Sequence, residues 1–244
     1  MRAAGHLVTI LLQIIALVAA RLATKRRPEA RFVRRRSLQW SLDSRIEVEP
    51  ERATLLANNL DWLREILSDR ERPVLFVFAG KAHPADEPGQ KLIRGITELS
   101  RLPGFEGHIL MVEGYDLHLA RRMVAGVDVW LNNPVYPLEA SGTSGMKAAI
   151  NGAINLSIID GWWGEAYDGK NGWAIKPTAP GLDPDLRDTE EARTLYELLQ
   201  DTVIPMYYRS TTLGYSPEWV SMAKHSIASI LPRFNMQRML KEYV

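Results

Sequence analysis

The sequence contains no cysteine. This absence excludes a disulfide framework, a thiolate zinc site and a cysteine nucleophile, and nothing requires an oxidising compartment. Over 244 residues, 46% are hydrophobic and 24% are charged. Such a composition excludes disordered, collagen-like and low-complexity proteins. We therefore expect a cytoplasmic globular protein of one large domain or two modest ones.

Other chemical signals are also absent. The five histidines are scattered, no pair stands at metal-ligand spacing with a carboxylate, and no G-x-S-x-G nucleophile elbow occurs. We expect no metal site. The net charge of +1 gives no general case for nucleic acid as a partner. The charge is unevenly distributed, however, because residues 1–50 hold ten Lys and Arg against four Asp and Glu.

A short apolar run, LVTILLQIIALVAA, occupies residues 7–20. It is too short to span a bilayer comfortably, and it fits the core of a signal peptide, a signal anchor or a helix buried in the protein. Because Thr9 and Gln13 lie four positions apart on one helical face, we favour the buried helix over membrane association. The basic residues that follow, Arg31 and Arg34 to Arg36, are interpreted as a solvated linker, since no aromatic residues interleave them. Residues 1–50 are thus predicted to be an atypical hydrophobic and basic leader.

From residue 53 onwards, helical and strand patterns alternate. This alternation predicts an α/β protein with a doubly wound parallel sheet. Ligands bind such sheets beyond the carboxyl ends of the strands, so the loops after the predicted strands are the places to search for a site. The predicted strands are 74–79, 108–112, 127–131 and 154–159, and the predicted helices are 53–67, 90–102, 117–125, 143–151, 188–204 and 217–231.

Small and hydroxylated residues precede the predicted helix that begins at Thr143. Ser141, Gly142, Ser144 and Gly145 complete this stretch. Free backbone N–H groups at a helix start, together with the helix dipole, form a socket for a phosphate or another anion. Residues of this kind are also common as plain helix caps, so both interpretations stay open. Lys147 is placed within the first turn or so, within reach of a phosphorylated cofactor.

Three stretches carry a family resemblance: FAGKAHPADEPG, VEGYDLHLARRMVAGVDVWLNNP and EASGTSGMKAAINGAINLSIIDGWWGEAYDGKNGWAI. Together they resemble the C-terminal domain of the α-glucan (glycogen/maltodextrin) phosphorylases, and more narrowly the bacterial branch of that family. The resemblance covers roughly residues 52–244. It implies that residues 51–244 form the Rossmann-like second domain of a GT-B glycosyltransferase, whose active site lies in the cleft between two domains. The first domain has no counterpart in this chain.

The resemblance also implies a cofactor, pyridoxal 5'-phosphate. The family binds it as a Schiff base on the lysine that matches Lys147. Gly142, Thr143 and Ser144 match the positions that hold the cofactor phosphate, in agreement with the anion socket. Tyr115 matches an aromatic residue that lies against the pyridoxal ring.

For the substrates, α-1,4-glucan and inorganic phosphate, the resemblance implies two further site residues and one loss. Glu139 matches the position that contacts hydroxyls of the reacting glucose, and Lys81 lies near the site in the GKAHP loop, with no assigned step. The family grips the substrate phosphate with a stretch ending in tyrosine, lysine and arginine. Here Pro50 and Glu51 stand in place of the tyrosine and lysine, and only Arg52 remains.

Three functions therefore compete. The first is part of an α-glucan phosphorylase, which releases glucose 1-phosphate, in a truncated chain that lacks the first domain. The second is a nucleotide-sugar-dependent GT-B glycosyltransferase, against which the full motif around Lys147 argues. The third is a non-catalytic remnant that binds pyridoxal phosphate. For Trp162, Trp163 and Trp173, core packing is favoured over stacking on sugars, and the sequence leaves homo-oligomerisation open.

Overall fold

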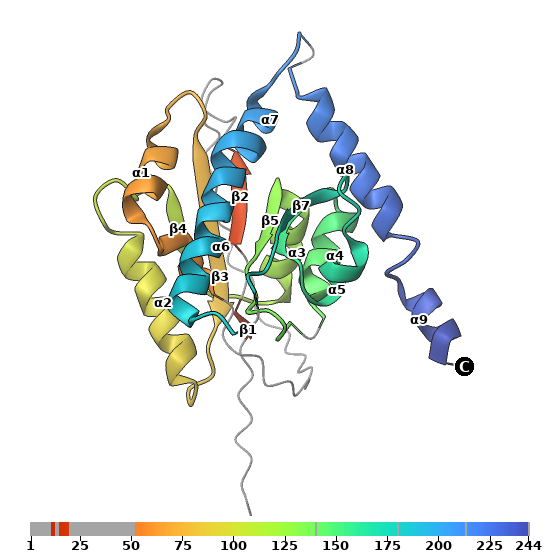
Figure 1. Ribbon diagram of the computed structural model, residues 1–244, viewed down its shortest axis with the longest axis horizontal. Coiled ribbons are helices and arrows are strands. Elements are labelled where there is room, and N and C mark those ends of the chain that lie inside the picture. Colours follow the sequence, from red (N-terminus) through yellow and green to blue (C-terminus); the bar gives the residue numbers. More distant parts are fainter. Residues whose placement is uncertain are drawn as a thin grey trace, which may run out of the picture.

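The computed structural model describes residues 11–12, 15–19, 52–139, 141–179, 181–212 and 214–243. Its centre is one β-sheet with the strand order β1-β3-β2-β5-β6-β7, in which β4 pairs with the other edge of β3 (Figure 1). The strands are β1 Leu11–Leu12, β2 Ile15–Ala19, β3 Val74–Lys81, β4 Ile109–Val112, β5 Val129–Asn132, β6 Ile154–Ile158 and β7 Gly172–Ile175. The helices are η2 Ala53–Ala57, α1 Leu60–Ser68, α2 Glu87–Leu99, α3 Leu117–Gly126, α4 Thr143–Ile150, α5 Gly161–Ala166, α6 Pro184–Leu198, η3 Leu199–Val203, α7 Ile204–Tyr208, α8 Pro217–Ile230 and α9 Met236–Tyr243.

Two groups of parallel strands form most of the sheet. Strand β3 pairs in parallel with β4, and β5, β6 and β7 pair in parallel in chain order. Every residue of β5 and β6 is buried, as expected for strands that are covered on both faces and therefore read as continuous apolar runs. The predicted α/β class with parallel strands is confirmed, and the predicted strands from residue 74 onwards occur close to their expected positions.

The N-terminal apolar run corrects one prediction. We expected a buried helix, but Ile15–Ala19 form strand β2, which lies antiparallel between β3 and β5. Leu17 pairs with Phe76 on one side and Val129 on the other, so the sheet is mixed and not purely parallel. Two rows of backbone partners between β3 and β5 favour the extended conformation over the local helical pattern.

Other predictions for the N-terminal fifth of the chain lie outside the described residues. These are the linker interpretation of Arg31 and Arg34 to Arg36 and the replacements Pro50 and Glu51. Within the part of the chain that the structure describes, no helix combines the length and the apolar character that crossing a membrane requires.

Helices cover both faces of the sheet because successive strand residues alternate in direction. Phe76 and Phe78 of β3 join a large core cluster with side chains of α1, α2, α6 and α8. Val77 and Ala79, which alternate with them, pack instead against α3 and α4 in a second cluster. The face that carries α4 is thus opposite to the face that carries α2.

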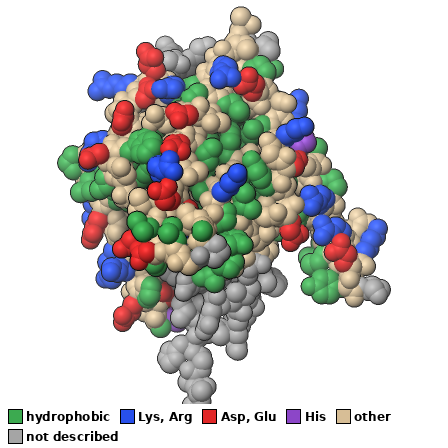
Figure 2. All heavy atoms as spheres, in the orientation of Figure 1, with side chains coloured by type: hydrophobic (Ala, Val, Ile, Leu, Met, Phe, Trp, Pro, Cys, Tyr) green, Lys and Arg blue, Asp and Glu red, His purple; other side chains and the backbone are tan. Residues whose placement is uncertain are grey.

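Several helix boundaries differ from those predicted. The predicted helix 53–67 is broken into η2 and α1, because the side chain of Asn59 caps α1 by accepting a hydrogen bond from the N–H of Trp62. The predicted helix 188–204 runs from 184 to 208 and widens into the π-turn η3 just before Pro205, which lacks an N–H group to continue the regular pattern. Helices α5 and α9 and strand β7 were not predicted. Helix α9 buries no side chain and stands away from the rest of the protein (Figures 1 and 2).

The central position of β2 gives a first testable prediction. Leu17→Pro removes a backbone N–H from a strand that is paired on both sides, and we expect it to lower the free energy of unfolding by about 3 kcal/mol or more. Urea unfolding followed by circular dichroism measures this loss. Leu17→Val, which keeps the N–H group, is the matched control. An unchanged unfolding midpoint for the proline variant would contradict the pairing of β2.

Candidate functional site

The carboxyl ends of β5 and β6 bring the predicted site residues to one edge of the sheet. Strand β5 ends at Asn132, and the loop that follows leads through Glu139 to the start of α4. Strand β6 ends at Ile158, and Asp160 then begins α5. Because β5 and β6 are parallel neighbours, both loops leave the sheet at the same edge.

The start of α4 has the features of an anion socket. Gly142 is its N-cap, with φ of 87°, a left-handed conformation that suits glycine and strains other residues. Gly142 has no side chain to cap the helix, and no side-chain hydrogen bond caps it. Thr143 is exposed and Ser144 is half-buried. The first N–H groups of a helix have no partner within it, and a helix start of this kind can bind an anion from outside.

Lys147 is the fifth residue of α4 and lies just beyond its first turn. It follows Thr143 by four positions, so the two side chains share one face of the helix. Side chains on a helix tilt towards its N-terminus, which directs the lysine back over the first turn. The Lys147 side chain is exposed, and its amine is therefore accessible beside the socket.

Tyr115 lies close to this face of the protein. It is half-buried and packs against the cluster that contains Ala79 of β3 and Ala148 of α4. Burial raises the pKa of its hydroxyl above the ordinary tyrosine value. The structure thus brings Tyr115 and α4 together around one apolar cluster, as a ring contact beside Lys147 requires.

Glu139 is buried against the socket, with 9% of its surface exposed. A methyl group on Gly142 would lie 2.5 Å from a carboxylate oxygen of Glu139. Burial is the main reason why the pKa of Glu139 is raised. A hydrogen bond from Asn132 acts in the opposite direction, and the negative charge of Asp160 raises the pKa further.

Asp160 fixes the loop that carries Glu139. One carboxylate oxygen accepts the N–H of Glu139 at 3.0 Å, and the other accepts the N–H of Gly161 at 2.8 Å. The N–H of Trp162 then donates to the carbonyl oxygen of Ser141 at 2.9 Å. These contacts hold the loop before α4 against the start of α5, so the position of Glu139 is determined by its neighbours.

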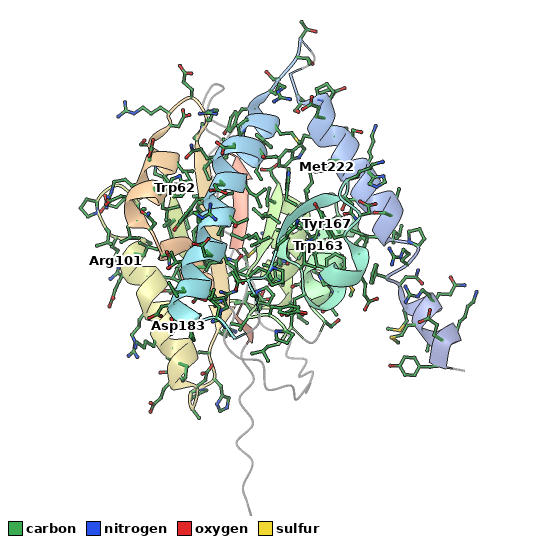
Figure 3. The ribbon with its side chains drawn as sticks, viewed as in Figure 1. Trp62, Arg101, Trp163, Tyr167, Asp183 and Met222 are labelled. Atoms are coloured by element: carbon green, nitrogen blue, oxygen red, sulfur yellow. The ribbon has the colours of Figure 1, made fainter. Side chains whose placement is uncertain are left out.

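The tryptophans of this region form part of the core. Trp162, Trp163 and Trp173 have exposures of 3%, 0% and 5%, which leaves no ring face for a sugar. The ring centroids of Trp163 and Tyr167 lie 5.4 Å apart (Figure 3). Trp162 contacts the rings of Trp163 and Phe234 at centroid distances of 5.2 and 5.5 Å. The packing interpretation of these residues is confirmed.

Lys81 is placed differently from the other predicted site residues. It ends β3, and its charge contributes to lowering the pKa of Asp116, which caps α3. Lys81 alternates with Val77 and Ala79 along β3, so its side chain lies on the face of the sheet that carries α3 and α4. His83, in the same loop, accepts the N–H of Ala85 through Nδ1 at 3.1 Å, which gives it a local structural role.

Three asparagines at this edge were not singled out from the sequence. The amide oxygens of Asn132, Asn133 and Asn155, and the amide nitrogen of Asn133, are buried without a hydrogen-bond partner in the described structure. Buried polar atoms without partners are uncommon and mark places where water, a ligand or another segment is accommodated. Asn132 ends β5 and Asn133 follows it, whereas Asn155 lies within β6. In the sequence, only the consecutive pair at 132 and 133 offered a signal.

Arg52, the remaining member of the phosphate-gripping triplet, is committed elsewhere. Its guanidinium is buried and forms ion pairs with Asp188, at 2.6 Å, and with Glu191. It also donates to the carbonyl oxygen of Pro134 at 2.8 Å. Because two carboxylates already neutralise this charge, Arg52 is a structural residue in the described protein.

Comparison with known proteins shows which sequences resemble this chain. Residues 58–165 match the carbohydrate phosphorylase family. This region of the chain is related to the phosphorylases. The chain is 50% identical over 194 residues to the maltodextrin phosphorylase of Thermococcus litoralis and to the glycogen phosphorylase of Aquifex aeolicus. It is 45% identical over 195 residues to the glycogen phosphorylase of Mycobacterium tuberculosis.

Each of these alignments covers 80% of the chain, and the predicted resemblance is confirmed. The chain nevertheless spans only part of each phosphorylase, namely 23%, 28% and 22% of their respective lengths. The chain thus spans about a quarter of the length of these relatives.

The close approach at Gly142 gives a second prediction. Gly142→Ala places a methyl group against Glu139 and Trp162 in addition to straining the left-handed backbone. Gly169→Ala is the matched control, because Gly169 has φ of 81° and nothing lies within 4 Å of the added methyl group. We expect Gly142→Ala to lose about 1–3 kcal/mol more than the control in urea unfolding, the usual cost of overpacking. Equal losses would show that the socket has room to spare.

The raised pKa of Glu139 predicts a pH dependence of stability. The folded protein binds this proton more tightly than the unfolded chain, so stability falls as the pH rises from the ordinary value of 4.5 through the raised value. Glu139→Gln lacks this titration. We expect the variant to gain stability relative to the unmodified protein as the pH rises above the ordinary value of 4.5. Urea unfolding at several pH values measures the difference, and parallel profiles would refute the raised pKa.

Proposed function

We propose that this chain is the cofactor-binding C-terminal part of an α-glucan phosphorylase. The observation that carries the proposal is the arrangement at α4: an uncapped helix start after Gly142, the Lys147 amine one turn above it, and the buried carboxylate of Glu139 beside it. The relatives named maltodextrin and glycogen phosphorylase support the choice of reaction, which transfers glucosyl units from an α-1,4-glucan to phosphate.

We further propose that residues 51–244 form the Rossmann-like second domain of a GT-B enzyme. A doubly wound sheet of this type has the strand order 3-2-1-4-5-6. The described order β4-β3-β2-β5-β6-β7 agrees with it if β2 occupies the first position, although β2 runs antiparallel. In such a sheet the ligand site lies where the order reverses, next to β5 and the loop that leads to α4.

The residues at this edge fit pyridoxal 5'-phosphate. The amine of Lys147 would hold the cofactor covalently, while the N–H groups and hydroxyls of Thr143 and Ser144 would hold its phosphate. Any side chain at position 142 would clash with Glu139, so only glycine allows the start of α4 to lie this close to that carboxylate. Tyr115 would lie against the ring. When bound, the cofactor supplies a phosphate that exchanges a proton with the substrate phosphate.

Glu139 is proposed to bind the sugar. A buried carboxylate accepts hydrogen bonds from hydroxyl groups, and Asn132 and Asp160 fix its orientation from either side. Positioning of this kind contributes to catalysis by holding the glucosyl unit in one geometry. The role requires no proton transfer by Glu139.

A second function, a remnant that binds the cofactor without turnover, is favoured by one observation. Arg52 is neutralised by Asp188 and Glu191, which leaves it without a role towards a second anion. Two phosphates in one small site repel each other strongly unless fixed cations offset their charge. The nucleotide-sugar enzyme has weaker support, since it gives Lys147 no role.

A cysteine-free sequence supports the proposed cytoplasmic location.

The proposal predicts covalent capture of the cofactor at Lys147. After incubation with pyridoxal 5'-phosphate and reduction with borohydride, peptide mapping should find the label at Lys147 well above surface lysines such as Lys224. Thr143→Val, which keeps the shape but removes the hydroxyl, should weaken binding by about 1–3 kcal/mol, the usual cost of a lost hydrogen bond to a charged group. Labelling of Lys147 no stronger than that of Lys224 would refute the cofactor site.

The proposal also predicts that the chain alone forms no measurable glucose 1-phosphate from maltodextrin and inorganic phosphate. An assay of these 244 residues alone includes no first domain to hold the glucan end against the phosphate, and orientation of reactants is worth about 7–11 kcal/mol of the barrier. A phosphate-dependent assay of the purified chain measures this activity, with Lys147→Ala as the control. Release of glucose 1-phosphate that is abolished in the control would show that this chain completes the site by other means.

A further inference from the structure

Helix α9 presents an apolar face that none of the described residues covers. Four large apolar side chains recur at the spacing of one helical face and are between 42% and 83% exposed: Met236, Met239, Leu240 and Tyr243. Figure 2 shows apolar side chains gathered on this helix, which projects from the body of the protein. An exposed apolar face of this kind marks a surface for interaction.

The helix depends on such an interaction for its stability. Isolated helices shorter than about 12–15 residues are marginal in water, and α9 has eight residues. Its support within the described chain is local: Asn235 accepts the N–H of Arg238 at 2.9 Å, and Arg238 pairs with Glu242 at 2.7 Å. Packing of the apolar face against another surface supplies the stabilisation that these local contacts lack.

The segment that leads into α9 is held against the body of the protein. Phe234 contacts the ring of Trp162 with centroids 5.5 Å apart, and Arg233 donates to the carbonyl oxygen of Glu165 at 3.1 Å. The helix itself extends from the α8 side of the molecule and is well separated from the start of α6 (Figure 1). It is therefore presented outwards from a fixed base.

A second exposed apolar surface, the rim, lies beside the candidate site. Its members are between 38% and 57% exposed and comprise Tyr136, Leu138, Leu182 and Leu186. The first two lie in the loop after β5, and the other two lie at or just before the start of α6. These segments are neighbours, because Arg52 contacts both the carbonyl oxygen of Pro134 and the carboxylate of Asp188. The rim ends next to Glu139, at the carboxyl edge of the sheet.

The two surfaces carry opposite charges. Four exposed side chains form no ion pair with a described residue: Arg233 and Lys241 at α9, and Asp183 and Asp185 at the rim. Figure 3 shows Asp183 at the start of α6, on the side opposite to α9. The basic side chains lie off the apolar face of α9, so they act through the electrostatic field and not through direct pairs. Opposite fields steer two surfaces together and make their association depend on salt.

We propose that the chain forms a two-fold dimer in which α9 of each copy docks on the rim of the other. A stable interface takes about 800 Å² from each partner, more than one eight-residue helix, about 12 Å long, supplies. In a two-fold dimer each copy contributes both a helix and a rim, so two equal contacts form together. Pairing of α9 with α9 would bury less surface and leave both rims exposed. The dimer is independent of the proposed function, since it requires no cofactor.

Sedimentation velocity of the full chain over a range of concentrations tests the dimer. We expect a monomer–dimer equilibrium that weakens as salt is added. Leu240→Glu on α9 and Leu186→Glu on the rim should each weaken dimerisation at least about tenfold, as expected for a lost buried leucine. The controls are Leu102→Glu, at an exposed leucine outside both surfaces, and Gln237→Glu, on α9 but off its apolar face. Both controls should leave the dimer in place.

Cysteine cross-linking identifies which surfaces meet, because the sequence has no cysteine of its own. One chain carries Met239→Cys, and a second chain, distinguished by isotope labelling, carries Leu186→Cys. We expect a short bifunctional thiol reagent to join the two kinds of chain. The reagent should join Met239→Cys chains to one another much less.

Four results would overturn the proposal. The first is a chain that stays monomeric at every accessible concentration. The second is preferential joining of Met239→Cys chains to one another, which would show that the two helices pair directly. The third is a cross-link within a single chain that carries both cysteines and persists on dilution, which would place α9 on its own rim. The fourth is equal weakening by Gln237→Glu or Leu102→Glu, which would reduce the effect to added negative charge.

Discussion

One buried positive charge connects the segments on which the site depends. The guanidinium of Arg52, at the start of η2, contacts Asp188 and Glu191 of α6 and the carbonyl oxygen of Pro134 in the loop after β5. A buried ion pair is costly to form, but removing one partner leaves an uncompensated charge and costs about 3–5 kcal/mol. These segments must therefore come together as a set. The loop held in this way continues to Glu139, so the site inherits its geometry from a contact made outside it.

Within the site, a second charged side chain, that of Asp160, also joins separate segments of the chain. Asp160 accepts hydrogen bonds from the N–H groups of both Glu139 and Gly161, which joins two loops that leave neighbouring strands. The resulting close packing leaves no space for a side chain at Gly142. As a result, the carboxylate of Glu139 is held in a fixed position beside the uncapped start of α4. The first feature depends on the side chain of Asp160 and the second on the absence of a side chain at Gly142, so we expect both positions to tolerate few substitutions.

Much of this arrangement could be predicted from the sequence, because it depends on local patterns. Apolar runs marked the parallel strands, and small residues before a helix marked the socket at Gly142 to Ser144. The position of β2 could not be predicted, since its partners Phe76 and Val129 are distant in sequence and local periodicity favours a helix. The roles of Asn133 and Arg52 were also hidden, because burial and pairing with α6 are tertiary properties. Lys81 was expected near the site because of its loop, and the alternation of β3 directs its side chain to the face of the sheet that carries α3 and α4.

The antiparallel strand β2 has a consequence for how the chain folds. Without it, β3 and β4 form one small sheet and β5, β6 and β7 another, each with an unpaired inner edge. Joining them requires Leu17 to find Val129, more than a hundred positions away, and contacts of such long range slow folding. During synthesis, the N-terminal strand emerges well before β5. Until the two meet, exposed edges of apolar strands can pair with other copies of the chain, so aggregation competes with folding during that interval.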